Sequence, residues 1–462
     1  MDRISTGIKS LDYILHGGLL TGSSILIMGN PGTGKTILAN QIIYNNACLN
    51  HNVLYLTTMS EPQTKIMKFQ QEFTYFNIDK FQQSVFYYDM SGILRKEGTA
   101  KVLTFIDGLL QKHQPKIVVI DTIKALADMI TSKPDFREFI SDISLKLTVW
   151  DCTSLFLGEY TEEEIGTRPE SAIADGIIYL SGIEEKKYQK RFMRILKMRG
   201  TSYQQGEIFF KITNDGFILF PRMNPEVCDD QKYDRDFTKR LSTGIDALDG
   251  MLGGGIPKGT VTLVSGGAGT GKTLLSAYFA CQGLKAGETV VYATFEENPE
   301  QFVNSAISIG LDFRPYLASG QITLIHISPV ELDMDEHVYF IQEYIREIKA
   351  SRLVIDSISS FELGLLDKVK YTDYIWSLAN YLKVLGVTTI MTHEIHQSFQ
   401  VSELTKHGIS FVADTLILLL YKDTELEIKR YLRIVKSRST HHEMALREYR
   451  ITSSGISIIS NS

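Results

Sequence analysis

At 462 residues the chain is too long for one ordinary domain and long enough for two or three. Its apolar fraction of 44% and charged fraction of 22% are those of a folded globular protein, and a net charge of -6 gives no overall attraction to nucleic acid or to an anionic membrane, so neither is an expected partner. The opening residues MDRISTG lack the charged and apolar regions of a signal peptide, no apolar run is long enough to span a bilayer, and the 4 cysteines include no CxxC pair. We therefore expect a cytoplasmic protein.

The chain contains a duplication. Residues 3–36 and 240–273 are identical at 18 of 34 positions without a gap, and so long a unit is a repeated domain rather than a solenoid module. Between the copies, residues 221–239 are mostly polar, include two prolines and show no apolar period. We therefore expect two similar domains, residues 1–220 and 240–462, joined by a linker over residues 221–239.

Short apolar runs alternate with helix-like stretches through each half. Continuous apolar runs predict strands that are buried on both faces, and their alternation with helices predicts an α/β domain with a mostly parallel sheet. Ligands of such sheets bind beyond the carboxyl ends of the strands. The expected strands are residues 24–29, 53–57, 116–121 and 153–158 in the first half, and 261–266, 290–295, 353–356 and 387–394 in the second.

Two glycine-rich segments, GNPGTGKT at 29–36 and GGAGTGKT at 266–273, match the P-loop pattern G-x-x-x-x-G-K-S/T. Each follows an expected strand and opens an expected helix, the context in which backbone N–H groups wrap around phosphate oxygens. The lysine then reaches the β- and γ-phosphates and the threonine binds Mg²⁺, so ATP and Mg²⁺ are the expected cofactors. The predicted nucleotide-binding residues are Gly29, Gly32, Thr33, Gly34, Lys35 and Thr36 in the first copy, and Gly266, Gly269, Thr270, Gly271, Lys272 and Thr273 in the second.

Two aspartates stand at the ends of strands that follow these loops. Asp121 and Asp356 each come after four or five strand residues, where the metal-side aspartate of a P-loop nucleotidase belongs. We therefore predict that the metal ion is held by Asp121 with Thr36 in the first half, and by Asp356 with Thr273 in the second.

The two copies differ at a place that bears on catalysis. Glu296 and Glu297 follow a strand in the second copy, whereas Met59 and Ser60 occupy the same positions in the first. A carboxylate at a strand end can deprotonate and align the oxygen that attacks a γ-phosphate, and Met and Ser cannot. We expect the second half to be catalytic and the first to keep nucleotide binding, unless the neighbouring Glu61 substitutes for the missing pair.

Together these features resemble the KaiC family, whose members are double-domain RecA-like ATPases. The resemblance rests on the STGI-x-x-LD opening of each half, both P-loops, FEE at 295–297, and closing segments at 195–217 and 434–456. It implies two tandem RecA-like P-loop NTPase domains and a homo-hexameric ring that binds ATP between subunits.

The same resemblance implies roles for two K-x-R pairs and for a phosphorylated segment. In each closing segment the lysine and arginine are expected to act on the γ-phosphate held by a neighbouring subunit, where a guanidinium stabilises transition-state charge; the residues are Lys197, Arg199, Lys436 and Arg438. The second domain is expected to be a serine/threonine autokinase with Ser410 and Thr405 as candidate acceptors, although Phe411 replaces the threonine that usually follows the serine. Such a ring would signal through protein partners that the sequence does not name.

Two alternatives stay open on the sequence. RecA-like cores also drive motors on DNA, as in DnaB-like proteins, and such motors need basic loops along a central channel. The segments after Asp121 and Asp356 are short and mixed in charge, which favours a signalling ring over a motor. The other alternative is a nucleotide-gated scaffold that does not turn ATP over.

Overall fold

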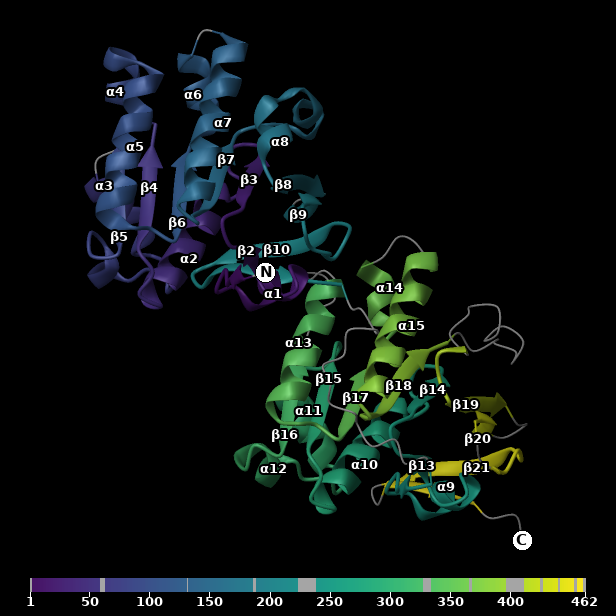
Figure 1. Cartoon of the computed structure of the whole chain (residues 1–462). Coiled ribbons are helices and arrows are strands. Elements are labelled where there is room, and N and C mark those ends of the chain that lie inside the picture. The colour runs from purple at the N-terminus through teal and green to yellow at the C-terminus, as the bar shows by residue number, and fades with distance from the viewer. Residues whose placement is uncertain are drawn as a thin grey trace. The chain divides into compact units, whose positions relative to one another are not determined.

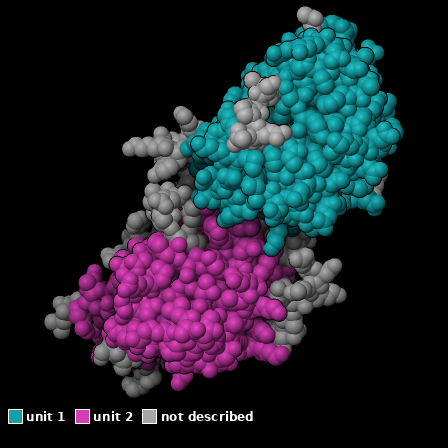
Figure 2. Space-filling view, turned by 90° about the vertical axis from the view of Figure 1, so that its left-hand side faces the viewer, with its two compact units in different colours: residues 1–221 teal, residues 222–462 magenta. Residues whose placement is uncertain are grey.

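The chain folds as two compact units, residues 1–221 and 222–462, which are coloured separately in Figure 2. A computed structural model describes residues 2–58, 63–130, 132–185, 188–222, 238–326, 334–364, 368–395, 411–423, 427–438, 441–452 and 455–459. Each unit holds one nine-stranded sheet (Figure 1), so each P-loop sequence belongs to a sheet of its own. Most of the expected linker, residues 223–237, lies outside the described residues.

The sheet of unit 1 has the order β11-β10-β9-β8-β3-β7-β6-β4-β5. The six strands from β8 to β5 run parallel, and β9, β10 and β11 extend the sheet by antiparallel pairing. The prediction of a mostly parallel sheet is confirmed. The strands are β3 (Ser24–Gly29), β4 (Val53–Thr57), β5 (Val85–Asp89), β6 (Ile117–Asp121), β7 (Thr153–Gly158), β8 (Gly176–Glu185), β9 (Tyr188–Met198), β10 (Ile208–Thr213) and β11 (Gly216–Phe220), with a separate pair β1 (Arg3–Ile4) and β2 (Leu19–Leu20).

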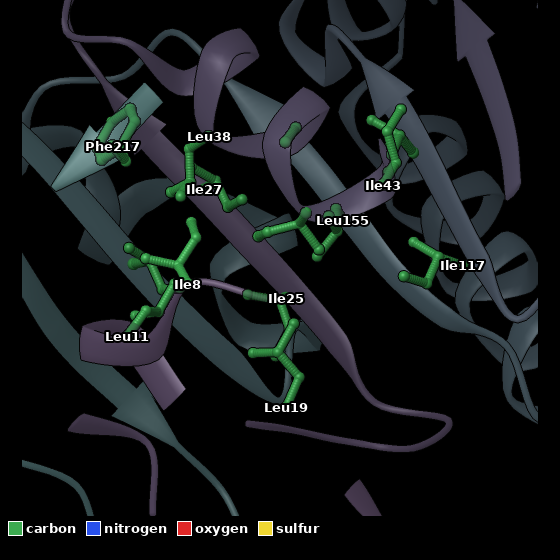
Figure 3. Close-up of a cluster of buried hydrophobic side chains, with 14 of the residues drawn as sticks. Ile8, Leu11, Leu19, Ile25, Ile27, Leu38, Ile43, Ile117, Leu155 and Phe217 are labelled. Atoms are coloured by element: carbon green, nitrogen blue, oxygen red, sulfur yellow. The ribbon is translucent and has the colours of Figure 1, made fainter. Parts of the chain in front are cut away.

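Helices cover both faces of this sheet because the central strands are apolar on both faces. Along β3, Ile25 and Ile27 pack with Leu38 in one core cluster (Figure 3), while Leu26 and Met28 belong to the cluster on the other face. The helices are α1 (Lys9–Ile14), α2 (Lys35–Cys48), α3 (Gln63–Gln70), α4 (Ser91–Glu97), α5 (Thr99–His113), α6 (Ile123–Met129), α7 (Lys133–Val149) and α8 (Pro169–Ile173), with short 3-10 helices at Ile78–Lys80 and Glu162–Thr167.

Unit 2 repeats the same design, with the sheet order β22-β21-β20-β19-β14-β18-β17-β15-β16. Its strands are β14 (Val261–Gly266), β15 (Val290–Thr294), β16 (Ile322–His326), β17 (Arg352–Asp356), β18 (Thr388–Glu394), β19 (Thr415–Asp423), β20 (Ile428–Ser437), β21 (Arg447–Thr452) and β22 (Gly455–Ile458), with a pair β12 (Arg240–Leu241) and β13 (Ile256–Pro257). Its helices are α9 (Asp246–Met251), α10 (Lys272–Lys285), α11 (Pro299–Ile307), α12 (Arg314–Ala318), α13 (Met334–Glu347), α14 (Ser360–Gly364) and α15 (Lys368–Val384). Among the described residues, no helix combines the length and apolarity that crossing a bilayer requires.

Candidate active sites

In each unit the P-loop joins a central strand to the helix that follows it. Gly34 is the N-cap of α2 with φ 101°, and Gly271 is the N-cap of α10 with φ 92°; both angles lie in the left-handed region that favours glycine. A buried threonine stabilises each loop through a hydrogen bond within the loop. Thr33 Oγ1 donates to the Asn30 carbonyl at 2.8 Å, and Thr270 Oγ1 donates to the Gly267 carbonyl at 2.7 Å. The first N–H groups of each helix therefore face a loop shaped to hold an anion.

The P-loop lysines lie over these loops. Lys35 Nζ donates to the carbonyls of Gly29 and Asn30, both at 2.9 Å, and Lys272 Nζ makes the matching pair of bonds in unit 2 at 3.0 Å. Burial lowers the pKa of both ammonium groups, and neighbouring carboxylates partly offset that effect. Each lysine is therefore in place to meet a phosphate bound by the loop.

On the metal side, the two aspartates end the strands β6 and β17, and each accepts from a buried tyrosine. Asp121 Oδ2 accepts from Tyr55 Oη at 2.6 Å and from Thr36 Oγ1 at 3.3 Å, and Asp356 Oδ2 accepts from Tyr292 Oη at 3.2 Å. Burial raises the pKa of Asp121, while the bond from Tyr55 opposes the rise. One hydroxyl and one carboxylate suit Mg²⁺, which takes oxygen ligands and completes its shell with water and phosphate oxygens.

The glutamate pair lies in the turn between β15 and α11. Thr294 Oγ1 fixes this turn, because it accepts from the Glu297 N–H at 3.2 Å and donates to the Glu297 carbonyl at 3.0 Å. Asn298 then caps α11 by accepting from the Gln301 N–H at 2.9 Å. One carboxylate oxygen of Glu297 is buried without a hydrogen-bond partner in the part of the chain that the structure describes.

In unit 2 most of the predicted nucleotide- and metal-binding residues line one cavity of about 400 Å³ together with the glutamate pair. Its lining includes Lys272, Thr273, Asp356, both glutamates of the pair and Glu394. Burial raises the pKa of Glu296, and the negative charges of Asp356 and Glu394 raise it further, while Lys272 opposes them. A carboxylate with a raised pKa accepts a proton more readily, which suits a general base.

Two features of the sites were not predicted. Glu394, the last residue of β18, and Glu159, which follows β7, occupy the same place in the two sheets, and both line the cavities. The sequence signal for both was an acid at the end of an expected strand. The tyrosines that donate hydrogen bonds to the two aspartates, Tyr55 and Tyr292, occupy the same position in the two copies. The sequence did not predict these bonds, because each aspartate lies on a different strand from its tyrosine.

The corresponding cavity of unit 1 measures about 350 Å³ and is lined by Thr36, Asp121 and Glu159 among other residues. Residues 59–62, which carry Met59, Ser60 and Glu61, lie outside the described residues, so the proposed replacement by Glu61 stays a prediction. Thr58, at the position of Phe295, is buried and donates through Oγ1 to the Asp121 carbonyl at 3.2 Å.

The K-x-R pairs lie at the opposite end of each sheet from the P-loop of the same unit. Lys197 pairs with Ile177 near the start of β8, and Ile177 in turn pairs with Leu26 on β3, three residues before the P-loop begins at Gly29. Three strand residues span roughly 10 Å. In unit 2, Lys436 pairs with Leu416 near the start of β19 in the same way. Neither pair is brought to the nucleotide site of its own unit.

These cations contact their own unit near the start of the sheet. Lys197 Nζ donates to the Ala174 carbonyl at 2.6 Å, and Arg199 pairs with Asp175 at 3.3 Å. Lys436 Nζ donates to the Ala413 carbonyl at 2.8 Å. In the same unit, Arg438 lies 3.8 Å from Asp414, which also receives Lys383 Nζ at 3.1 Å. The predicted strand position holds for both lysines, whereas Arg199 and Arg438 each come one residue after their strand.

The phosphorylation candidates Ser410 and Thr405 lie outside the described residues. Phe411, the residue after Ser410, is 63% exposed, and β19 begins at Thr415. The structure therefore leaves both acceptors as predictions.

Comparison with known proteins agrees with this architecture. The family model described as "ATPase: KaiC" matches residues 4–224 and again residues 241–462. The chain is similar to the circadian clock oscillator protein KaiC of Picosynechococcus sp., with 29% identity over 99% of this chain and 90% of the relative. The protein of the same name from Rippkaea orientalis is also 29% identical, over 99% of this chain and 88% of the relative. Both repeats match the model and the relatives match nearly end to end, so the chain is a member of the KaiC family of ATPases.

Proposed function

We propose that unit 2 hydrolyses ATP with Glu296 as the general base, and that unit 1 binds ATP and has lost most of its turnover. The observation that carries this proposal is the shared cavity of unit 2, in which Glu296 lies with Lys272 and Asp356. Unit 1 has Met59 and Ser60 where unit 2 has the glutamate pair.

The chemistry follows from the residues of that cavity. The P-loop and Lys272 would hold the phosphates, and Thr273 with Asp356 would hold Mg²⁺, which offsets charge on the β- and γ-phosphates. Glu296 would take a proton from a water molecule as the water oxygen bonds to the γ-phosphorus. The bond from that phosphorus to the leaving oxygen of ADP breaks in the same displacement.

We also propose that the chain assembles as a homo-hexameric ring with nucleotides between subunits. The K-x-R pairs support this, because each lies at the end of its sheet remote from the P-loop of its own unit, and the proposed partner is the P-loop of another copy. A ring is the closed assembly that repeated head-to-tail contacts of this kind produce.

Autophosphorylation and signalling through partner proteins form the finer part of the proposal. Ser410 is the proposed acceptor, and support comes from its place in the sequence before β19 and from relatives that are named as circadian clock oscillator proteins. Peptide mass mapping after incubation with ATP tests it on the intact chain and on Ser410→Ala. Phosphate found only outside residues 402–415 would remove Ser410 from the proposal.

The division of labour is tested by changing one P-loop lysine at a time. Lys272→Ala should abolish most phosphate release. Lys35→Ala should reduce ATP retention or ring assembly, but the rings that still form should keep most of the wild-type rate of phosphate release. Phosphate release and ring content are measured on the same samples. If Lys35→Ala abolished turnover while rings persisted, catalysis would belong to unit 1.

A further inference from the structure

Unit 1 carries an exposed apolar surface where α7 ends. Leu145, Val149 and Trp150 are 64%, 76% and 40% exposed, and the first two stand four residues apart on one side of the helix. Asp151 follows directly and lines a cavity of about 410 Å³ together with Arg199. The α7 patch, which we define as Leu145, Val149, Trp150 and Asp151, therefore lies beside the arginine that would act on another copy in the proposed ring.

A second exposed surface of unit 1 lies beside its nucleotide site. Phe69, near the end of α3, is 61% exposed, and it also lines the cavity that includes Thr36 and Asp121. Lys68 is exposed and has no ion pair among the described residues, and Lys65 Nζ lies 6.0 Å from the centre of the Phe69 ring. We call Lys65, Lys68 and Phe69 the α3 patch. It is aromatic and basic, whereas the α7 patch is apolar and ends in an aspartate.

The two patches lie at opposite ends of the unit 1 sheet. The α3 patch is near Asp121, the last residue of β6, whereas Trp150 comes three residues before β7 begins. In the pairing of β6 with β7, Ile117 faces Thr153 and Asp121 faces Leu157, so four strand residues, or roughly 13 Å, separate the two ends. A contact between two different patches therefore needs a second copy of the chain, and its repetition from copy to copy closes a ring.

Unit 2 lacks both patches, although its fold repeats that of unit 1. The turns after α7 and α15 correspond, because Asp151 and Gly386 have φ angles of 55° and 69° and each lies two residues before the next strand. The residues at the patch positions of unit 2 are Ser305 and Ala306 in α11, counted from the proline that the two copies share, and the buried Leu385 with Gly386. Two surfaces that bind each other are expected to be present together or absent together, as these are.

We propose that the α7 patch of one copy binds the α3 patch of the next copy in the ring. Val149 and Trp150 pack against Phe69, and Asp151 pairs with Lys68. The apolar side chains leave water in this contact, and the opposite charges determine which patches meet. The inference rests on the proposed ring and names the surfaces that join unit 1 of adjacent copies.

The contact agrees with the proposed role of Arg199. Asp151 and Arg199 line one cavity, and Phe69 lines the nucleotide cavity, so binding of the two patches brings the arginine of one copy toward the nucleotide of the other. Asp151 also lies 3.6 Å from Lys116, but both side chains are mostly exposed, and such a surface pair is weak. It therefore leaves Asp151 available to a second partner.

Sedimentation velocity of the full chain with ATP and Mg²⁺ tests the proposal. Trp150→Ser should raise the chain concentration at which half of the rings dissociate by tenfold or more, as the loss of a central aromatic side chain does at an interface. Trp376→Ser is the matched control, because it removes a tryptophan that is 53% exposed on α15 of unit 2, and it should leave that concentration unchanged. Circular dichroism shows whether both variants are folded.

Reversal of the charges supplies a test that does not depend on the tryptophan. Lys68→Glu and Asp151→Lys should each weaken assembly, and a chain that carries both should recover most of it. Such recovery cannot come from damaged folding, so it decides the question if Trp150→Ser fails to fold. Lys101→Glu, on the exposed face of α5, reverses an equal charge elsewhere in unit 1 and should assemble as the wild type does.

The outcomes separate this contact from the ring itself. If the wild type forms rings and Trp150→Ser assembles equally well, or if the double reversal assembles no better than the single variants, the contact is wrong and the ring stands. If the wild type sediments as a monomer at saturating ATP, the proposed ring is wrong and the contact is overturned with it.

Discussion

At the scale of single residues, the environment of Glu296 decides what the unit 2 site can do. The side chain is held by a turn whose backbone is fixed by Thr294, and it shares a cavity with Asp356 and Glu394. Both neighbouring carboxylates favour the protonated form of Glu296, as does its burial. The same surroundings that make it a better base therefore also make it easier to inactivate with acid.

The raised pKa of Glu296 predicts a pH dependence. A base works only when deprotonated, so hydrolysis should fall, as pH decreases, at a higher pH than the ordinary glutamate pKa of about 4.3 would give. Glu394→Gln removes one negative charge that raises the pKa of Glu296. The acid limb of the phosphate-release profile should then move to lower pH. The exposed Glu347→Gln serves as control, and a limb that moved to higher pH in Glu394→Gln would contradict the assignment.

The two glutamates should differ in their effect on turnover. General-base assistance contributes ~10² to 10⁴ in rate, so Glu296→Gln should slow phosphate release by at least the lower figure. Glu297→Gln should cost less, because Glu296 stays in place. ATP binding should change little in either variant, since the P-loop and Mg²⁺ hold the nucleotide. Rates of phosphate release and ATP binding are measured on the same preparations. If Glu297→Gln lost more of the rate than Glu296→Gln, Glu297 rather than Glu296 would be the general base.

At the scale of elements, the glutamate pair depends on how α11 begins. Asn298 and Pro299 supply the cap and the first residue of this helix, directly after Glu297. Asn298→Ala should destabilise unit 2 by ~1 kcal/mol in denaturant unfolding. It should lower turnover more than ATP binding, because the start of α11, directly after the glutamate pair, loses its cap. Asn77→Ala removes a comparable cap, on the 3-10 helix Ile78–Lys80 of unit 1. Equal turnover in the two variants would show that the cap does not position the pair.

The bounds of several strands could be predicted from the local sequence. The expected strands at 24–29, 53–57, 153–158 and 261–266 have the bounds that the structure shows, because strands buried on both faces are continuous apolar runs. The edge strands β5 and β16 were missed. VFYYD and ITLIH are only partly buried, so their apolar signal is weaker and mixed with polar residues.

Contacts between elements were harder to predict than the elements. The bonds from Tyr55 and Tyr292 to the aspartates join neighbouring strands that are distant in the sequence. The effect of Glu394 on Glu296 acts between the ends of β18 and β15, which are separated in the sheet by β17. They follow from the strand order, which a single sequence does not specify.

At the scale of the whole molecule, both units place a P-loop at one end of the sheet and a lysine–arginine pair at the other. In unit 1 the arginine Arg199 pairs with Asp175, and in unit 2 Arg438 lies near Asp414. On the proposed ring assembly, these side chains would complete a nucleotide site of a second copy of the chain. Assembly and catalysis should then fail together when either partner of the contact is removed.

Complementation between two inactive variants tests this most directly. Lys272→Ala removes the unit 2 P-loop lysine but keeps Arg438, and Arg438→Ala keeps the P-loop, so each variant alone should lack most turnover. In mixed rings an intact cavity meets an intact arginine at roughly a quarter of the contacts, and a comparable share of wild-type activity should return. A mixture of Lys272→Ala with Glu296→Gln is the matched control. Its two lesions affect the same cavity, so no contact is whole and no activity should return. If native mass spectrometry showed mixed rings and the first mixture stayed inactive, Arg438 would not act across subunits.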